Sequence, residues 1–198
     1  MLVHQIFSTP ILQLKFNKHS QYSLPNFSKG ERNPAKWDCS LYTTYPNVLS
    51  DDKLVRPNFI KSLKKDLKSE INILFKDLEI PIDWHFEHFW YNYYYEGQGQ
   101  ETHDHLANVG EKSIYWSGIY FHTTNGTSTG FVNPCNSHMS HRYPNCTEGK
   151  LATSHFDSWY PFVEDGDVIL FPPYVRHYVP PSPKSEKMRF TFSFNLLL

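Results

Sequence analysis

The sequence predicts a mostly β-stranded protein, a sandwich or a barrel, that is supported by one helix. One segment with helical periodicity, residues 57–78, precedes several short segments with the composition of β-strands, and turn residues separate these segments. The chain of 198 residues has about the length of one domain and can bury a substantial core. We therefore expect a single domain, residues 1–198, with an N-terminal strand and the supporting helix in residues 1–85 and the β core in residues 86–198.

The N-terminal part contains one expected strand and the expected helix. Residues 6–16 are apolar and β-prone, although Pro10 interrupts them, and residues 17–56 are polar and rich in turn formers. In residues 57–78, apolar side chains recur every three or four positions with lysines between them, which is the pattern of an amphipathic helix. We expect the apolar side of this helix to pack on the outer face of a sheet.

The part after Pro81 has the pattern of strands and turns. The segments with strand composition are residues 82–97, 113–121, 130–134, 167–173 and 188–198. A long polar insert, residues 135–164, separates the third of these segments from the fourth. The sequence indicates no role for this insert.

Composition and charge narrow the range of functions. The formal net charge of -1 gives no support for nucleic-acid binding. No stretch approaches the ~18 apolar residues of a membrane span, and the N-terminus lacks the pattern of a signal peptide. The three cysteines have no CxxC spacing, which argues against a disulfide framework or a structural zinc site. We expect a cytoplasmic protein with no membrane partner; the oligomeric state stays open, a homodimer included.

His103 and His105 form the first candidate fragment of a metal site. Side chains two positions apart in a β-strand share a face, so these imidazoles would converge while Asp104 points the other way. Two imidazoles on one face make half of a site for a transition metal. Alone, the pair is more simply interpreted as two surface histidines beside a turn.

His177 is the second candidate fragment. It follows an apolar strand and a double proline, and a second double proline comes shortly after it. Proline fixes the backbone, and such rigidity suits a ligand that must hold its position. Without other fragments, a histidine that caps a turn would be the simpler interpretation.

The final strand alternates between an apolar and a polar face. The polar face consists of Arg189, Thr191, Ser193 and Asn195. Such a face can be a solvated outer surface, or it can line the lumen of a barrel. In a lumen, Arg189 could bind a carboxylate in bidentate fashion while Thr191 donates a hydroxyl from the same face.

The order of these fragments matches a known pattern. The matching residues are, in chain order, Trp90, Asn92, Tyr94, Gly97, His103, His105, Ser117, Gly118, Tyr120, Phe121, Phe131, Asn133, Pro134, Gly166, Ile169, Phe171, Pro172, His177, Arg189, Thr191, Ser193, Phe194 and Asn195. Together they resemble the 2-oxoglutarate/Fe(II)-dependent oxygenase family, and within it a poorly characterised, prolyl-hydroxylase-like branch. The resemblance is dense from about residue 86 onward.

The resemblance implies a fold and an activity. The implied fold is a double-stranded β-helix, a jelly-roll or cupin-like barrel with iron at its open mouth. The implied enzyme couples decarboxylation of 2-oxoglutarate to hydroxylation of a C–H bond, on a prolyl residue or on a small metabolite. Fe(II) is the implied cofactor, 2-oxoglutarate and O2 are the co-substrates, and ascorbate is an optional addition. The sequence does not name the primary substrate, a peptide or protein or a small metabolite.

The resemblance also assigns roles to residues. His103 and His177 carry over as ligands of the iron. Arg189 would meet the far carboxylate of 2-oxoglutarate, and the other expected cofactor-binding residues are Thr191, Tyr94 and Asn92.

This sequence departs from the commoner family pattern at one metal ligand. Most of the family uses two histidines and one carboxylate, whereas the position two after His103 is His105. The ligand set ranked first is His103, His105 and His177. A second set has Asp104 turned inward by a β-bulge. In a third, His105 pairs with Ala107, which leaves the carboxylate position open.

Two functions compete with the oxygenase interpretation. A cupin-like metal-binding protein without 2-oxoglutarate-dependent activity would share the barrel and the three histidines, but it would not need Arg189 with Thr191. A metal-free β-sandwich that binds a sugar or a peptide through its aromatic residues is the other.

Overall fold

The structure, a computed structural model, describes residues 9–24, 31–32, 41–45, 57–106, 108–109, 112–134 and 157–198. The first part of the expected N-terminal strand and most of the polar insert lie outside the described residues. None of the described helices is both long and apolar enough to cross a membrane.

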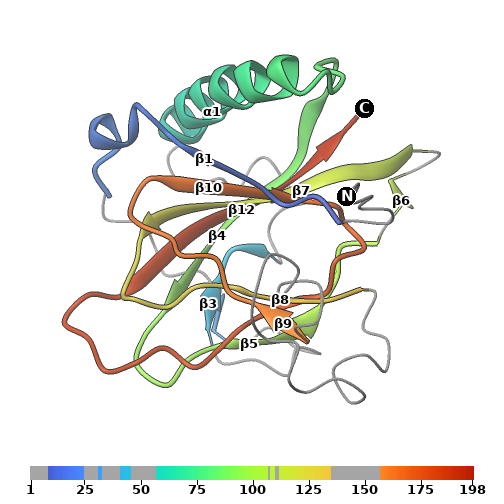
Figure 1. The fold of residues 1–198 in the computed structure, drawn as a ribbon. Coiled ribbons are helices and arrows are strands. Elements are labelled where there is room, and N and C mark those ends of the chain that lie inside the picture. Colours follow the sequence, from blue (N-terminus) through green and yellow to red (C-terminus); the bar gives the residue numbers. More distant parts are fainter. Residues whose placement is uncertain are drawn as a thin grey trace, which may run out of the picture.

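Two antiparallel sheets and one long helix form the fold (Figure 1). The larger sheet has the order β1-β10-β7-β12-β4-β3-β2, with β6 paired to β7. Its strands are β1 Leu12–Lys15, β2 Glu31–Arg32, β3 Tyr42–Thr43, β4 His85–Tyr94, β6 Asn108–Val109, β7 Lys112–Thr123, β10 Asp167–Phe171 and β12 Arg189–Leu197. The smaller sheet has the order β5-β11-β8-β9, with β5 Gln100–His103, β8 Gly130–Val132, β9 Ser158–Trp159 and β11 His177–Val179. A short 3-10 helix, His19–Gln21, follows β1.

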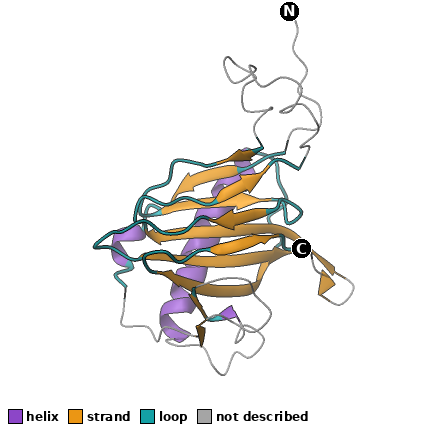
Figure 2. Ribbon diagram, turned by 90° about the horizontal axis from the view of Figure 1, so that it is seen from below, coloured by secondary structure: helices purple, strands orange, loops and turns teal. Residues whose placement is uncertain are grey.

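The long helix α1, Pro57–Asp77, covers the outer face of the larger sheet and runs across its strands (Figure 2). Leu63, Leu67 and Ile71 follow one another at every fourth position and are fully buried. They belong to the same core cluster as the phenylalanines of β12. Burying one such side chain contributes roughly 1.5–3 kcal/mol, so this stripe fixes the helix on the sheet. The helix and its packing face agree with the prediction from the sequence.

The two faces of strand β12 point to different sides of the larger sheet. It pairs with β4 on one side and with β7 on the other, so it lies inside the sheet. Phe190, Phe192 and Phe194 pack in the cluster under α1. The polar face, which begins with Arg189 and ends with Asn195, is buried as well. Because it points away from α1, it lines the space toward the smaller sheet, and the interpretation as a lumen is correct.

Two short strands differ from the sequence prediction. β5 ends at His103, so Asp104 and His105 lie beyond it rather than within one regular strand. His177 is not in a bare connection after the prolines but opens β11, where it pairs with both His103 and Phe131. Strands this short carry too few residues for a period to appear in the sequence, which is why they were missed.

Candidate metal centre and anion site

Three histidines converge between the two sheets. His103 and His177 face each other as partners across β5 and β11, which brings their β-carbons within about 4.5–5.5 Å. His105 comes from the segment after β5, and its backbone N–H donates to the carbonyl of Pro173 at 2.9 Å. The second proline of the Pro172–Pro173 pair therefore holds the segment that carries His105.

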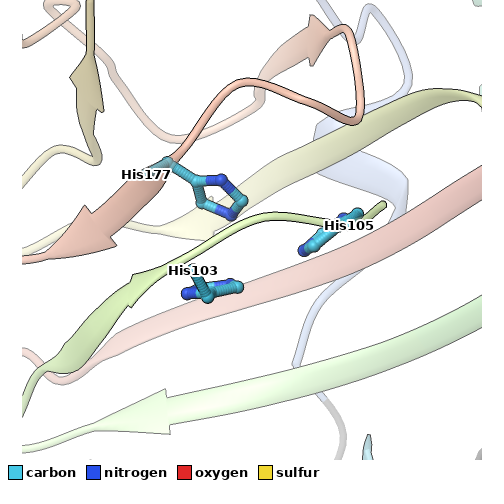
Figure 3. Close-up of side chains that lie close together, drawn as sticks. All are labelled: His103, His105 and His177. Atoms are coloured by element: carbon cyan, nitrogen blue, oxygen red, sulfur yellow. The ribbon is translucent and has the colours of Figure 1, made fainter. Parts of the chain in front are cut away.

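The three rings face a common space (Figure 3). The candidate ligand atoms of His103, His105 and His177 all lie within 4.8 Å of one another. The ring centroid of His177 is 4.3 Å from that of His103 and 4.9 Å from that of His105. Such a cluster of imidazoles suits iron and other transition metals.

The Nδ1 atoms of His103 and His177 are held by backbone carbonyls. Nδ1 of His103 donates to the carbonyl of Glu101 at 2.9 Å, and Nδ1 of His177 donates to the carbonyl of Val175 at 3.1 Å. A carbonyl only accepts, so the proton of each neutral ring is on Nδ1. The lone pair of each ring is then on Nε2, the atom that can bind a metal ion.

His105 is held by side chains instead. Its Nδ1 lies 2.8 Å from Oγ of Ser117 and 2.9 Å from Oδ1 of Asn195. With Nδ1 as the donor, Nε2 of His105 also carries a lone pair. All three rings thus have the tautomer that a metal ligand needs.

Burial keeps the three imidazoles neutral. Loss of hydration, with the neighbouring His103 as the second cause, lowers the pKa of His105 to about 3. Desolvation is likewise the first cause that lowers the pKa of His103 and His177. At neutral pH none of the rings carries a proton that a metal ion would have to displace.

Asp104 points away from the cluster. It is exposed, and its Oδ1 accepts the backbone N–H of Leu106 at 3.1 Å, in a local turn. Among the described residues, the cluster of possible ligand atoms consists of His103, His105 and His177 and does not include this carboxylate. Ala107, on which the open-site alternative depends, lies outside the described residues.

Arg189 is a buried cation in the same interior. Its residue is only 1% exposed, and the rings of Tyr94 and Phe121 lie 5.1 and 5.3 Å from its Cζ atom. Nη1 donates to the carbonyl of Ser128 at 3.0 Å, and Nη2 donates to Oγ1 of Thr129 at 2.9 Å. Burial lowers the pKa of Arg189 to about 10, so the guanidinium is still charged at neutral pH.

This cation has no counter-anion in the described part of the chain. None of the ion pairs between described residues includes Arg189, and its Nε has no hydrogen-bond partner there. Burying a charge without a partner costs free energy, and an anionic ligand beside Arg189 would offset this cost. The chemistry of the site fits a carboxylate at this position.

Polar groups connect Arg189 with the histidines. The hydroxyl of Tyr94, which packs against the guanidinium, donates to Oε1 of Gln100 at 3.0 Å. Nε2 of the same Gln100 lies 3.4 Å from Nε2 of His103. On the other side, Thr129 contacts Arg189 and lies two residues before Phe131, the partner of His177.

The two remaining predicted residues lie beside Arg189. Thr191 and Asn92 are buried partners across β12 and β4. Nδ2 of Asn92 donates to Oγ of Ser193 at 3.2 Å, whereas its Oδ1 has no partner among the described residues. Sequence reasoning did not single out Gln100, Ser128 or Thr129.

A family model supports the assignment from geometry. The model described as "Putative 2OG-Fe(II) oxygenase" matches residues 88–195, which include every candidate site residue named above from β4 to β12. A comparison with curated proteins gave no match.

Similar solved structures show the fold. The viral collagen prolyl hydroxylase vCPH from Paramecium Bursaria Chlorella virus-1, solved as a 2OG complex, has 12% identity and a TM-score of 0.50, covering 94% of this chain and 95% of that chain. A Pseudomonas putida prolyl-4-hydroxylase has 10% identity and a TM-score of 0.53, covering 96% and 92%. The fold is therefore the double-stranded β-helix that the family resemblance implied. A 2OG-Fe(II) oxygenase family oxidoreductase from Burkholderia pseudomallei has 11% identity and a TM-score of 0.42 over 58% of this chain, and the match spans only 45% of that chain.

Proposed function

The chain belongs to the 2OG-Fe(II) oxygenase family, and we propose that it is an enzyme that couples decarboxylation of 2-oxoglutarate to hydroxylation of a C–H bond. The observation that supports this most strongly is the buried Arg189, which has no counter-anion among the described residues and lies in the same interior as three neutral histidines. A cation and a metal site that share one interior suit a ligand with a carboxylate at each end.

His103, His105 and His177 would hold Fe(II) through their Nε2 atoms. Their tautomers and their neutral state fit a divalent ion, and imidazole is a common ligand of iron. When bound, iron would supply the centre at which 2-oxoglutarate, O2 and the C–H bond of a substrate react to give succinate, CO2 and the hydroxylated substrate. With an imidazole in place of the usual carboxylate, the site keeps one more unit of positive charge, which strengthens its attraction for an anionic co-substrate.

Arg189 would bind the carboxylate of 2-oxoglutarate that does not reach the iron. A guanidinium has five N–H groups, and the hydrogen bonds to Ser128 and Thr129 use two of them. Enough donors remain for a two-pronged contact with a carboxylate. Thr191, Tyr94 and Asn92 line the same side and would complete the anion site.

The buried Arg189 also argues against the cupin-like alternative. A metal protein that does not use 2-oxoglutarate has no reason to hold an unpaired guanidinium in its interior. For the primary substrate we propose a C–H bond in a prolyl residue of a peptide or protein, or in a small metabolite. The single-domain organisation and the cytoplasmic location expected from the sequence stay predictions.

An anaerobic titration tests the proposal. Fe(II) is added to the protein without oxygen, and 2-oxoglutarate is then titrated while the visible absorption is followed. Chelation of the iron by the keto acid gives a metal-to-ligand charge-transfer band, which we expect to saturate at one equivalent. If Fe(II) binds but no band forms at any concentration of 2-oxoglutarate, the cupin-like alternative is favoured instead.

A further inference from the structure

The three histidines differ in what holds their outer nitrogen. Backbone carbonyls hold Nδ1 of His103 and His177, so any sequence with this backbone supplies these two contacts. Only His105 depends on side chains, Ser117 and Asn195. This is also the histidine that stands where most of the family has a carboxylate.

The side-chain network around His105 is consistent in its donors and acceptors. The hydroxyl of Ser117 donates to Oδ1 of Asn195 at 2.9 Å, and the same two oxygens lie within hydrogen-bond distance of Nδ1 of His105. Nδ2 of Asn195 points to Nδ1 of His88 at 3.4 Å, which fixes the amide with its oxygen toward His105. The network therefore presents acceptors to His105, and its Nδ1 must be the donor.

Ser117 and Asn195 belong to regular, paired strands, whereas His105 does not. Ser117 in β7 and Asn195 in β12 are paired neighbours in the middle of the larger sheet, and both are buried. His105 lies beyond the end of β5, and its backbone N–H donates to the carbonyl of Pro173 instead of to a neighbouring strand. Its ring direction therefore depends on the larger sheet rather than on its own strand.

We propose that Ser117 and Asn195 are positioning residues that make His105 the third metal ligand. They fix its Nδ1–H tautomer and direct its Nε2 toward the space shared with His103 and His177. The proposal rests on the proposed function only in that the three histidines bind a metal ion. It assigns to two residues of the larger sheet a role that the ligand histidines alone do not reveal.

Because Ser117 and Asn195 are uncharged, they also determine how strongly the His105 ring donates electrons to a metal ion. A carboxylate at Nδ1 would make the ring a stronger donor to the metal, as in carboxylate–histidine–metal triads. An amide and a hydroxyl leave the ring an ordinary neutral imidazole. Replacing the amide with a carboxylate should therefore keep the position of the ring but change its electronic effect on the ion.

Titration of the protein with Co(II) tests the positioning role without turnover. The Asn195→Leu variant keeps the size of the side chain and removes the acceptor; we expect its affinity for Co(II) to fall roughly 10- to 100-fold. The affinity of Ser117→Ala for Co(II) should fall less, because Oδ1 of Asn195 remains as an acceptor. Asn195→Asp restores an acceptor and should recover most of the affinity. Ser193→Ala is the matched control, since Ser193 lies on the same face of β12 but hydrogen-bonds to Asn92; its affinity should equal that of the wild type.

Proton NMR of the Co(II) protein separates this proposal from the proposed function. Each bound imidazole with an Nδ1–H gives one hyperfine-shifted signal that disappears in D2O, so the wild type should show three. Fewer than three in the wild type would refute the three-histidine site itself. If the wild type shows three, the signal of His105 should be lost or broadened by solvent exchange in Asn195→Leu and should return in Asn195→Asp. Asn195→Leu with wild-type affinity and three sharp signals would overturn the positioning role. If Asn195→Leu does not fold, wild-type behaviour of the double variant Ser117→Ala with Asn195→Ser, which loses one acceptor and shortens the other, would overturn it equally.

Discussion

Replacing Arg189 by Met should weaken the binding of 2-oxoglutarate without lowering the free energy of unfolding. Methionine keeps the length of the buried stem and removes the guanidinium, so the interior stays filled. In the free enzyme Arg189 is a buried cation that has no anionic partner among the described residues. Removing it should therefore leave the free energy of unfolding unchanged or raise it, whereas most buried substitutions lower it by 0.5–3 kcal/mol or more.

The same substitution should weaken binding of 2-oxoglutarate strongly. A two-pronged, charge-assisted contact with a carboxylate contributes about 1.5–3 kcal/mol in total, and Arg189 has spare N–H groups for it. Since about 1.4 kcal/mol is tenfold, the affinity should fall roughly 10- to 150-fold. Arg189→Lys should recover only part of the loss, because an ammonium cannot make the two-pronged contact. Affinity for Fe(II) should barely change.

The assay is the anaerobic titration of 2-oxoglutarate into the Fe(II) protein, combined with urea denaturation of the metal-free protein. Wild type, Arg189→Met and Arg189→Lys are compared under identical conditions. Equal affinities for 2-oxoglutarate in wild type and Arg189→Met would refute the reasoning. A loss of several kcal/mol of stability in the metal-free Arg189→Met protein would refute the idea that the cation waits for a ligand.

Further predictions concern the histidines and the helix. His177→Ala should bind no stoichiometric iron by elemental analysis while its circular dichroism stays that of the wild type; retained iron would remove it from the ligand set. His105→Ala should lose iron and Asp104→Asn should keep it, and the reverse result would establish the carboxylate ligand. The pKa of His105 is lowered to about 3 in the folded protein and is about 6.5 when unfolded, so the unfolded state binds more protons below pH 6.5. Acidification from pH 7 to pH 5 should therefore lower the free energy of unfolding of the metal-free protein by about 2 kcal/mol from this group alone. Urea denaturation that shows no such loss would contradict the buried neutral state of His105. Leu67→Ala removes a fully buried side chain under α1 and should lower the free energy of unfolding by about 2–5 kcal/mol in urea; a smaller change would mean that the helix is not fixed by this stripe.

Long periodic elements could be predicted from the sequence. Leu63, Leu67 and Ile71 recur at every fourth position, and this repeat located α1 and its buried side. The strict alternation from Arg189 to Asn195 gave the two faces of β12, because a strand has only two sides. In both elements the spacing of the apolar side chains along the sequence matches the period of the backbone.

The details of the site depend on contacts between distant segments. The sequence suggested that His103 and His105 converge because they share a strand, yet β5 ends at His103 and the carbonyl of Pro173 holds the following segment. Gln100 and Thr129 carry no local signal of their contacts with His103 and Arg189, because these contacts form only when the two sheets come together. Residue types and order were therefore readable from the sequence, whereas the partners that orient them were not.

Turnover under isotopically labelled oxygen tests the central claim most directly. The Fe(II)-loaded wild type is incubated with 2-oxoglutarate under 18O2, and the succinate is analysed by mass spectrometry. Coupling of O2 reduction to decarboxylation of 2-oxoglutarate predicts succinate that contains one atom of 18O, formed slowly even without the primary substrate and far more slowly by the His177→Ala protein. Succinate without the label, or an equal amount from wild type and His177→Ala, would contradict an oxygenase at this site.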